Sequence, residues 1–122
     1  MAAQHEFLHL FRHSPDAKTV AAGATLFQPD DPGDVLYVVL SGQVEIRIAG
    51  KVVETVGPGG IIGEMALLDR APRSAAAVVV ADATVVPVDE RRFLFLIQQT
   101  PFFALNVMRV MADRLRRRTA SR

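Results

Sequence analysis

The middle of the chain shows the alternation of apolar and polar positions that half-buried β-strands require. Residues 44–48 read Val-Glu-Ile-Arg-Ile, and residues 36–40 form an apolar run rich in β-branched and aromatic side chains. Turn residues recur roughly every eight or nine positions, at 29–34, 41–42 and 49–51. Further strands are predicted at 52–56, 75–81 and 84–88, with Asp82 separating the last two, and residues 20–27 form a short apolar segment interrupted by Gly23. Short strands at this spacing predict an antiparallel sandwich, roll or barrel.

On both sides of this region the apolar period becomes that of a helix. Residues 5–13 place their apolar side chains on one broad face, and Ser14-Pro15-Asp16 ends the segment. Asp89 is a suitable N-cap for a second helix that reaches about Gln99. The residues expected to face inward from that helix are Phe93, Leu96 and Ile97.

Thr100-Pro101 begins a last helix, with proline at the first helical position, where its missing N–H costs nothing. The helix is predicted to run from Phe102 to about Arg118, and it carries two apolar lines. One line has a three-four heptad rhythm and comprises Leu105, Met108, Ala112 and Leu115. The other comprises Phe103, Val107, Val110 and Met111. This width suits a helix that packs on its own domain on one side and on another helix on the other; a single broad face on the core explains it equally well.

The pattern as a whole predicts one domain of the α+β, mainly β, class. A short N-terminal helix occupies residues 1–16, an antiparallel β-roll residues 19–88 and two C-terminal helices residues 89–122. The length of 122 residues suits one core, and 50% hydrophobic residues with 22% charged residues are typical of a globular chain. The absence of cysteine excludes disulfides, thiol catalysis and cysteine-ligated metal clusters.

Charge and hydropathy bear on location and partners. The first residues lack the pattern of a signal peptide, and no apolar stretch approaches the ~20 residues of a membrane helix, so a cytoplasmic domain is expected. The net charge is +1, yet six arginines lie in residues 109–122 against Asp113 alone. This basic end raises nucleic-acid binding as an alternative. Arginines at a helix C-terminus are usually solvated, and no aromatic residues interleave these, which disfavours that alternative.

Three histidines fall at helical spacing near the N-terminus, namely His5, His9 and His13. Zinc can be bound by two histidines four positions apart on a helix, but it needs further ligands, and the sequence indicates none. The simpler interpretation is a solvated polar face opposite the apolar one.

The most unusual stretch runs from Gly57 to Ala77 and reads GPGGIIGEMALLDRAPRSAAA. Its glycines permit positive φ and a close approach of the backbone to a ligand. Their order matches neither the dinucleotide-binding fingerprint nor a P-loop. Glu64 and Arg73 are charges in small or apolar surroundings, where an unpaired charge is costly.

Two interpretations of this stretch follow from its residue types. Arg73 can clamp two phosphate oxygens and Ser74 can add a hydroxyl, whereas Glu64 accepts hydrogen bonds and suits a sugar hydroxyl. Together they predict a ribose phosphate ligand, with free N–H groups facing the anion if Glu64 begins a helical turn. The alternative is a structural salt bridge between Glu64 and Arg73, and spacing alone does not decide between the two.

Residues 63–75, GEMALLDRAPRSA, resemble the phosphate-binding cassette of the cyclic nucleotide-binding domain family. Pro32-Gly33-Asp34, the strand 36–39 and Ser41-Gly42-Gln43-Val44 are similar to that family's earlier turn, strand and glycine. The spacing on to Phe93, Pro101 and Arg114-Leu115 also follows the family. The resemblance covers essentially the whole chain. It implies a jelly-roll-like double-stranded β-helix and favours the ligand over the salt bridge.

The resemblance implies a ligand site formed by Gly63, Glu64, Met65, Ala66, Arg73 and Ser74. In the family, the glutamate matching Glu64 bonds the ribose 2′-hydroxyl with help from the backbone of the glycine. The arginine matching Arg73 binds the cyclic phosphate, assisted by the residue matching Ser74 and by nearby cassette amides. A serine at position 74 is associated with cAMP more often than with cGMP, so cAMP is the favoured ligand.

For the purine, the positions that reach the base in the catabolite activator branch of the family fall at Arg118 and Thr119. The small hydroxyl residues of that branch are not both retained here, because Arg118 is long and charged. In channel-type members an arginine of this helix stacks over the base instead, and Arg116 or Arg118 is the candidate for that role.

The resemblance implies a sensor without enzymatic activity or cofactor. Phosphate is expected to draw the cassette toward Arg73, and the last two helices then close over the purine. Contact between Leu67 or Leu68 and the 89–99 helix is expected to couple the two events. A second copy of the chain is a candidate partner for the last helix. Regulators of the family continue into an effector domain, so a stand-alone receptor and a fragment of a regulator, channel or kinase both stay open.

An enzyme remains as an alternative, because a β-roll of this size also resembles the cupin scaffold. Cupin chemistry needs histidines and a carboxylate converging from the strands on a metal. All three histidines precede residue 14, and Glu64 has no second carboxylate or histidine beside it in the cassette. The sequence therefore disfavours an enzyme.

Overall fold

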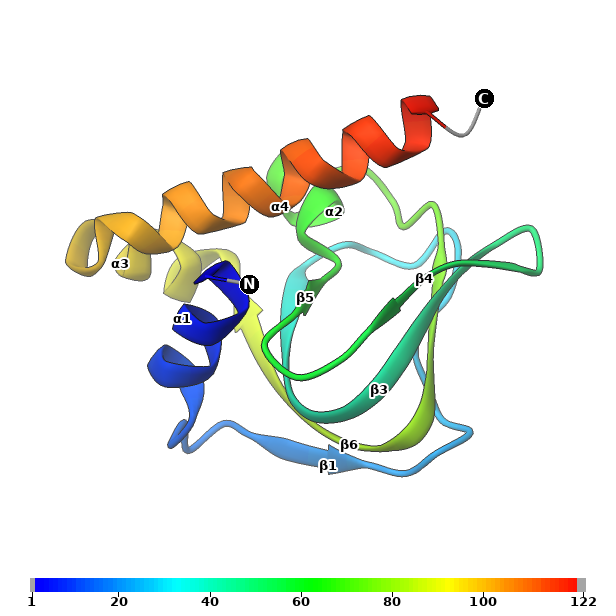
Figure 1. Ribbon diagram of the computed structural model, residues 1–122, viewed down its shortest axis with the longest axis horizontal. Helices are drawn as coiled ribbons and strands as arrows, with labels where there is room; N and C mark the ends of the chain where they lie inside the picture. Colours follow the sequence, from blue (N-terminus) through cyan, green and yellow to red (C-terminus); the bar gives the residue numbers. More distant parts are fainter. Residues whose placement is uncertain (1, 121–122) are drawn as a thin grey trace.

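The computed structural model describes residues 2–120, with the side chains of residues 6–117. In chain order the elements are α1 (Ala2–Phe11), β1 (Lys18–Val20), β2 (Thr25–Phe27), β3 (Val35–Ile48), β4 (Lys51–Val56), β5 (Ile61–Ile62), α2 (Glu64–Asp69), β6 (Ala76–Asp89), α3 (Glu90–Gln99) and α4 (Pro101–Ala120). The strands curl into a roll, α1 and α3 lie at one end of it, and α4 crosses above α2 (Figure 1).

The strands form one antiparallel sheet. Its order is β1-β6-β3-β4, while β2 also pairs with β6 and β5 with β3. The pairing of β3 with β6 extends from Val35 opposite Asp89 to Arg47 opposite Ala76, so these two long strands form the body of the roll. The predicted antiparallel β-roll with a short N-terminal helix and two C-terminal helices is confirmed.

Two predicted strand boundaries are wrong. The turn signals at Ser41-Gly42 and at Asp82 predict ends of strands, but β3 and β6 each continue for 14 residues. Gly42 has a φ of 85°, and a Cβ on it would lie 2.3 Å from the carbonyl oxygen of Asp82. The pairing register shifts between Val39 and Val44. Glycine here bends the strand without ending it, because the neighbouring strand follows the same bend.

The apolar core has two parts. The interior of the roll contains Phe27, Val39, Val44, Ile46, Val56, Ile62, Ala75, Ala77, Val79, Ala83 and Val85. The second part lies between the roll and the helices and contains Phe7, Phe11, Leu36, Val38, Ile61, Leu67, Val86, Val88, Phe93, Leu96, Phe103 and Val107. The ring of Phe103 lies 5.9, 6.0 and 5.4 Å from the rings of Phe7, Phe11 and Phe93, each at an edge-on angle. These contacts join α1, α3 and α4.

The predicted starts of both C-terminal helices are confirmed. Asp89 is extended and its Oδ1 accepts a hydrogen bond from the Arg92 amide at 2.9 Å, which caps α3. Pro101 is the first residue of α4. At the other end of the chain, α1 ends at Phe11 and not at residue 16, since the Ser14 amide turns back to the Phe11 carbonyl at 3.0 Å.

The two apolar lines of α4 face in different directions. Phe103 and Val107 are buried, and Val110 and Met111 pack against the same core. On the other line, the exposed fraction is 57% for Met108 and 50% for Leu115. Within the described residues, no single helix combines the length and apolar composition of a membrane span. Only α3 and α4 taken together pass that test, and the chain bends by 118° between them.

His9 and His13 are exposed, on α1 and just after it, and the side chain of His5 lies outside the described residues. Among residues with described side chains, no cluster of histidines, aspartates and glutamates could hold a metal ion.

Candidate functional site

In the cassette, residues 63–75, the chain turns sharply just before the short helix α2. Gly63 precedes α2 with a φ of 81°, a left-handed conformation that glycine adopts without strain. A Cβ on Gly63 would lie 2.4 Å from Nη1 of Arg73, so any other residue here would displace the guanidinium. The predicted helical turn at Glu64 is confirmed, and α2 covers Glu64–Asp69.

Arg73 is a buried cation with one nitrogen that has no hydrogen-bond partner. Its side chain is held by backbone carbonyls, since Nη1 donates to Gly63 O at 2.8 Å and Nη2 donates to Val35 O. Its guanidinium carbon lies 4.1 Å from the centre of the Phe27 ring, a cation–π contact. The exposed fraction of Arg73 is 4%, and its buried Nε has no hydrogen-bond partner. Buried donors are rarely left unpaired in proteins.

The electrostatic state of Arg73 follows from this environment. Burial lowers the pKa of the guanidinium below its ordinary value, although electrostatic interactions with Tyr37, Asp34 and Glu64 offset part of the effect. An arginine stays charged even after such a shift. The site therefore contains a desolvated positive charge that an anion would stabilise.

Glu64 is paired with an arginine that sequence reasoning did not assign to it. Its exposed fraction is 2%, and its Oε1 accepts a hydrogen bond from Nη1 of Arg114 at 2.6 Å. No ion pair joins Glu64 to Arg73 among the described residues, so the salt bridge that stood as the alternative to a ligand is wrong.

Arg114 reaches the site from α4, across the mouth of the roll. Its Nε and Nη2 donate to the two carboxylate oxygens of Glu54 on β4, at 2.9 and 3.1 Å, and Nη2 also donates to Ile61 O at 2.6 Å. Burial by itself lowers the pKa of Arg114, but the charge of Glu64 and the hydrogen bond and charge of Glu54 outweigh it, and the pKa is raised. Arg114 therefore ties α4 to β4, β5 and the cassette.

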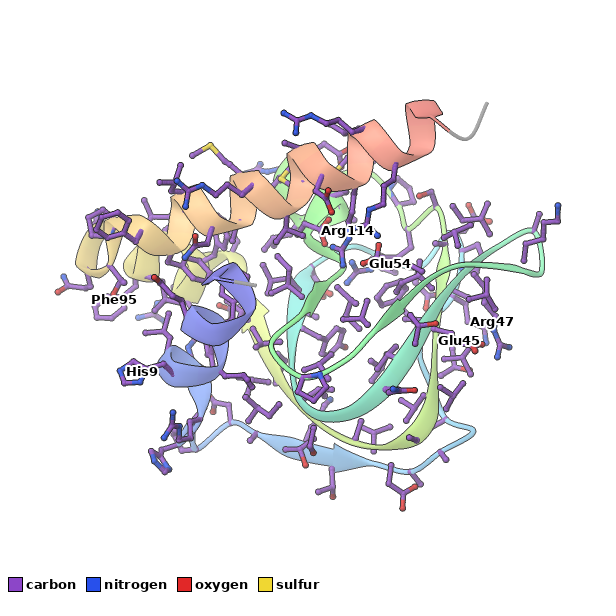
Figure 2. All side chains as sticks on the ribbon, in the orientation of Figure 1. His9, Glu45, Arg47, Glu54, Phe95 and Arg114 are labelled. Carbon is purple, nitrogen blue, oxygen red and sulfur yellow. The ribbon has the colours of Figure 1, made fainter. Side chains whose placement is uncertain are left out.

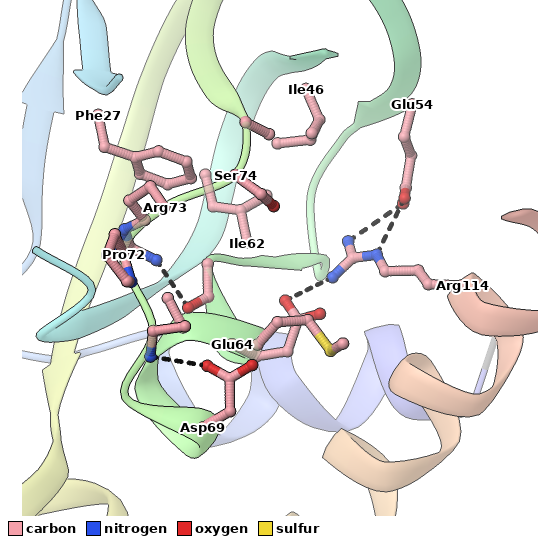
Figure 3. Close-up of a pocket in the computed structure, with 15 residues that line it drawn as sticks. Phe27, Ile46, Glu54, Ile62, Glu64, Asp69, Pro72, Arg73, Ser74 and Arg114 are labelled. Atoms are coloured by element: carbon pink, nitrogen blue, oxygen red, sulfur yellow. Dashed lines mark hydrogen bonds and ion pairs between the residues drawn. The ribbon is translucent and has the colours of Figure 1, made fainter. Parts of the chain in front are cut away.

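These groups surround one pocket of about 190 Å³ (Figure 3). Its lining residues are Phe27, Ile46, Glu54, Ile62, Gly63, Glu64, Met65, Ala66, Asp69, Ala71, Pro72, Arg73, Ser74, Ala75 and Arg114. In the close-up, Arg73 and Phe27 lie at one end, Glu64 lies between, and Arg114 with Glu54 lies at the other end. The pocket thus has a cationic end and a carboxylate-rich end, with apolar side chains on its walls.

The structure brings together only part of the predicted site. Six of the predicted residues line the pocket, namely Gly63, Glu64, Met65, Ala66, Arg73 and Ser74. Arg116 is exposed and does not line it. The side chains of Arg118 and Thr119 lie outside the described residues.

Sequence reasoning missed Glu54 and Arg114 as site residues. Arg114 follows Val107 and Val110 on the inward line of α4, at three-four spacing, and this helical phase was a usable signal. Glu54 gave no comparable signal. It shares a strand face with buried Val56, but the neighbouring Val52 and Val53 are exposed, so the apolar pattern of β4 does not identify the inner face.

Comparison with known proteins agrees with this geometry. The sequence pattern of the cyclic nucleotide-binding domain family matches residues 17–100. The cyclic AMP receptor protein of Thermus thermophilus is 37% identical over 99 residues, which cover 77% of this chain and 46% of that protein. The Pycsar effector protein XpPycTIR of Xanthomonas perforans is 35% identical over 102 residues, covering 83% of this chain and 32% of that protein.

Solved structures give the same result. The crystal structure of the Thermus thermophilus catabolite activator protein superimposes with a TM-score of 0.81 and 32% identity, over 95% of this chain and 57% of that one. The chain spans less than half the length of the two curated relatives. A buried arginine and glutamate in a shared pocket, the β-roll around them and the match over residues 17–100 lead to one conclusion: the chain belongs to the cyclic nucleotide-binding domain family.

Proposed function

We propose that this domain is a non-enzymatic receptor for a cyclic nucleotide, with cAMP favoured, and that ligand binding moves the C-terminal helices. The observation that carries the proposal is the buried guanidinium of Arg73, whose Nε has no partner in a pocket shared with Glu64. A cyclic phosphate supplies the acceptor and the negative charge that this group lacks.

The ligand is oriented by the two ends of the pocket. The phosphate lies at Arg73 and Ser74, next to the amides of Met65 and Ala66, and the ribose hydroxyl bonds Glu64. The base then points toward α4, with Arg116, Arg118 and Thr119 as the candidates for contact. The preference for cAMP is supported by Ser74 and by the similarity to the cyclic AMP receptor protein of Thermus thermophilus.

One ion pair and one shared core support coupling to the helices. Arg114 joins α4 directly to Glu64, and Leu67 of α2 belongs to the same core part as Phe93 and Leu96 of α3. A ligand that moves the cassette would act on the Arg114 pair directly and on α3 through that core. The coupling is limited by the difference in affinity between the two positions of the helices.

The proposal extends to a partner. The exposed heptad line of α4, which includes Met108, offers a surface for α4 of a second copy. An effector domain or partner protein is a further candidate partner, and we place the protein in the cytoplasm. Nucleic-acid binding through the basic tail is disfavoured, because Arg114 is buried and Arg117 pairs with Asp113. Metal chemistry of the cupin kind is disfavoured because His9 and His13 lie on α1 and just after it, away from the strands.

A calorimetric titration with cAMP and cGMP tests the assignment. Wild type is expected to bind, and Arg73→Ala should lose about 2–3 kcal/mol, or tens- to a hundredfold in affinity, because a charge-assisted contact is lost. Arg47→Ala is the matched control, since Arg47 pairs with Glu45 on the roll, away from Arg114 and Glu54 (Figure 2). Absence of binding by wild type, or equal binding by Arg73→Ala, overturns the proposal. Turnover of the bound nucleotide would overturn its non-enzymatic part.

A further inference from the structure

The pocket contains two carboxylates that share one guanidinium, and they share it unequally. Glu54 accepts from Nε and Nη2 of Arg114 with both of its oxygens, which is the two-bond fork geometry. Glu64 accepts a single bond, from Nη1 to its Oε1. The second oxygen of Glu64, Oε2, accepts none of the hydrogen bonds found among the described residues.

This division has a consequence for any ligand that donates to Glu64. A guanidinium engages a carboxylate best through two parallel bonds, so Arg114 would take both oxygens of Glu64 if its fork were not already occupied. Glu64 is also the drier partner, with a side-chain exposure of 3% against 20% for Glu54, and ionic contacts are stronger where water is excluded. The two hydrogen bonds to Glu54 therefore keep Nε and Nη2 of Arg114 directed at β4.

We propose that Glu54 is a positioning residue for the ligand site: by holding the fork of Arg114, it keeps one oxygen of Glu64 available for a ligand hydroxyl. The proposal deepens the function given above and rests on it. Glu54 need not touch the ligand. It acts through Arg114, and its effect is confined to the hydroxyl that Glu64 receives.

The measurement is the contribution of the 2′-hydroxyl to binding. It is the ratio of the dissociation constants for 2′-deoxy-cAMP and cAMP, each measured by calorimetry on the full chain. For wild type a ratio on the order of ten is expected, because the missing hydrogen bond has a charged acceptor. In Glu54→Gln only the amide oxygen can accept hydrogen bonds from Arg114, so the contact through two oxygens is lost. The ratio should fall at least severalfold, through weaker binding of cAMP with little change for the deoxy ligand.

A second substitution separates positioning from a general structural effect. Lysine in Arg114→Lys carries one ammonium and cannot form a fork, so Arg114→Lys combined with Glu54→Gln should recover a ratio above that of Glu54→Gln alone. Glu45→Gln is the matched control, because Glu45 is also a strand glutamate paired with an arginine but does not line the pocket. Thermal unfolding of each variant establishes that it is folded. If Glu54→Gln alone is unfolded, the double variant is compared with wild type, and a ratio well below that of wild type overturns the role of Glu54.

The outcomes are distinguishable. A ratio in Glu54→Gln equal to that of wild type, or equal weakening of both ligands, overturns the role of Glu54 and leaves the receptor function in place. The same holds if the double variant shows no recovery. Failure of wild type to bind either cAMP or cGMP overturns the proposed function, and the role of Glu54 with it. A wild-type ratio near one overturns the role of Glu64 as hydroxyl acceptor, on which that of Glu54 depends.

Discussion

The two arginines of the pocket, Arg73 and Arg114, are buried to a similar extent but differ in the groups that surround them. Arg73 has an exposed fraction of 4% and Arg114 of 9%. Around Arg73 are two carbonyls, an aromatic ring and an Nε without a partner. Around Arg114 are two carboxylates and a carbonyl that engage all three of its nitrogens.

The difference appears in the direction in which the pKa of each arginine is shifted. Burial lowers the pKa of Arg73, whereas the glutamates around Arg114 outweigh burial and raise its pKa. The charge of Arg114 is compensated by carboxylates within the fold, whereas Arg73 is held by carbonyls and its charge would be stabilised by an added anion. Burial alone therefore does not distinguish the two arginines; the balance of nearby charges does.

Removal of Arg114 should have the largest effect on the folded protein. Arg114→Ala leaves Glu64 buried without its partner and is expected to cost about 3–5 kcal/mol of unfolding free energy, measured in urea. Combining Arg114→Met with Glu64→Gln removes both charges and should recover part of this loss. Arg47→Ala breaks a more exposed pair and should cost no more than about 1 kcal/mol. A cost for Arg114→Ala as small as for Arg47→Ala would contradict the structural role.

Removal of Arg73 should act on the ligand more than on the fold. At a ligand concentration of about 100 times the dissociation constant, cAMP is expected to stabilise wild type by about 2.7 kcal/mol. Arg73→Ala should lose this ligand-dependent gain at the same cAMP concentration. Its stability without ligand should fall by only about 1–2 kcal/mol, from the lost hydrogen bonds to Gly63 and Val35. If Arg73→Ala destabilised the free protein as strongly as Arg114→Ala, the contrast between the two arginines would be wrong.

Substitution of Gly63 tests the geometry at the Arg73 end. Gly63→Ala places a Cβ against Nη1 of Arg73 and strains a left-handed residue, at a cost of about 1–2 kcal/mol, and it should also weaken cAMP binding. Gly50→Ala is matched in backbone strain, with a φ of 79°, but a Cβ there meets nothing within 4 Å. Calorimetry should show weaker binding for Gly63→Ala only. Equal affinity in the two variants would show that displacement of Arg73 does not matter.

The smallest effect on the stability of the domain is expected from substitutions on the exposed heptad line of α4. Met108→Glu changes an exposed side chain and should alter stability by no more than about 0.5 kcal/mol. If that line pairs two chains, the same change should dissociate a dimer, which sedimentation velocity measures. Wild type that sediments as a monomer at all accessible concentrations would refute the pairing.

Local sequence signals predicted much of this molecule because the physics behind them is local. Asp89 caps α3 and Pro101 begins α4, since both effects involve only neighbouring residues. The predicted breaks at Ser41-Gly42 and Asp82 failed for the opposite reason. Whether a glycine ends a strand or bends it depends on the strand beside it, and here β3 and β6 bend together.

The sequence by itself determined the fold class, the starts of α3 and α4 and the composition of the cassette, including the glycine that Arg73 packs against. Only the tertiary structure decided which arginine meets Glu64. Arg73 is near in sequence but paired with carbonyls, whereas Arg114 lies 50 positions away and reaches Glu64 because α4 crosses the mouth of the roll. Glu54 was undecided for the same reason, since it becomes a pocket residue only when a helix 60 positions later delivers its partner.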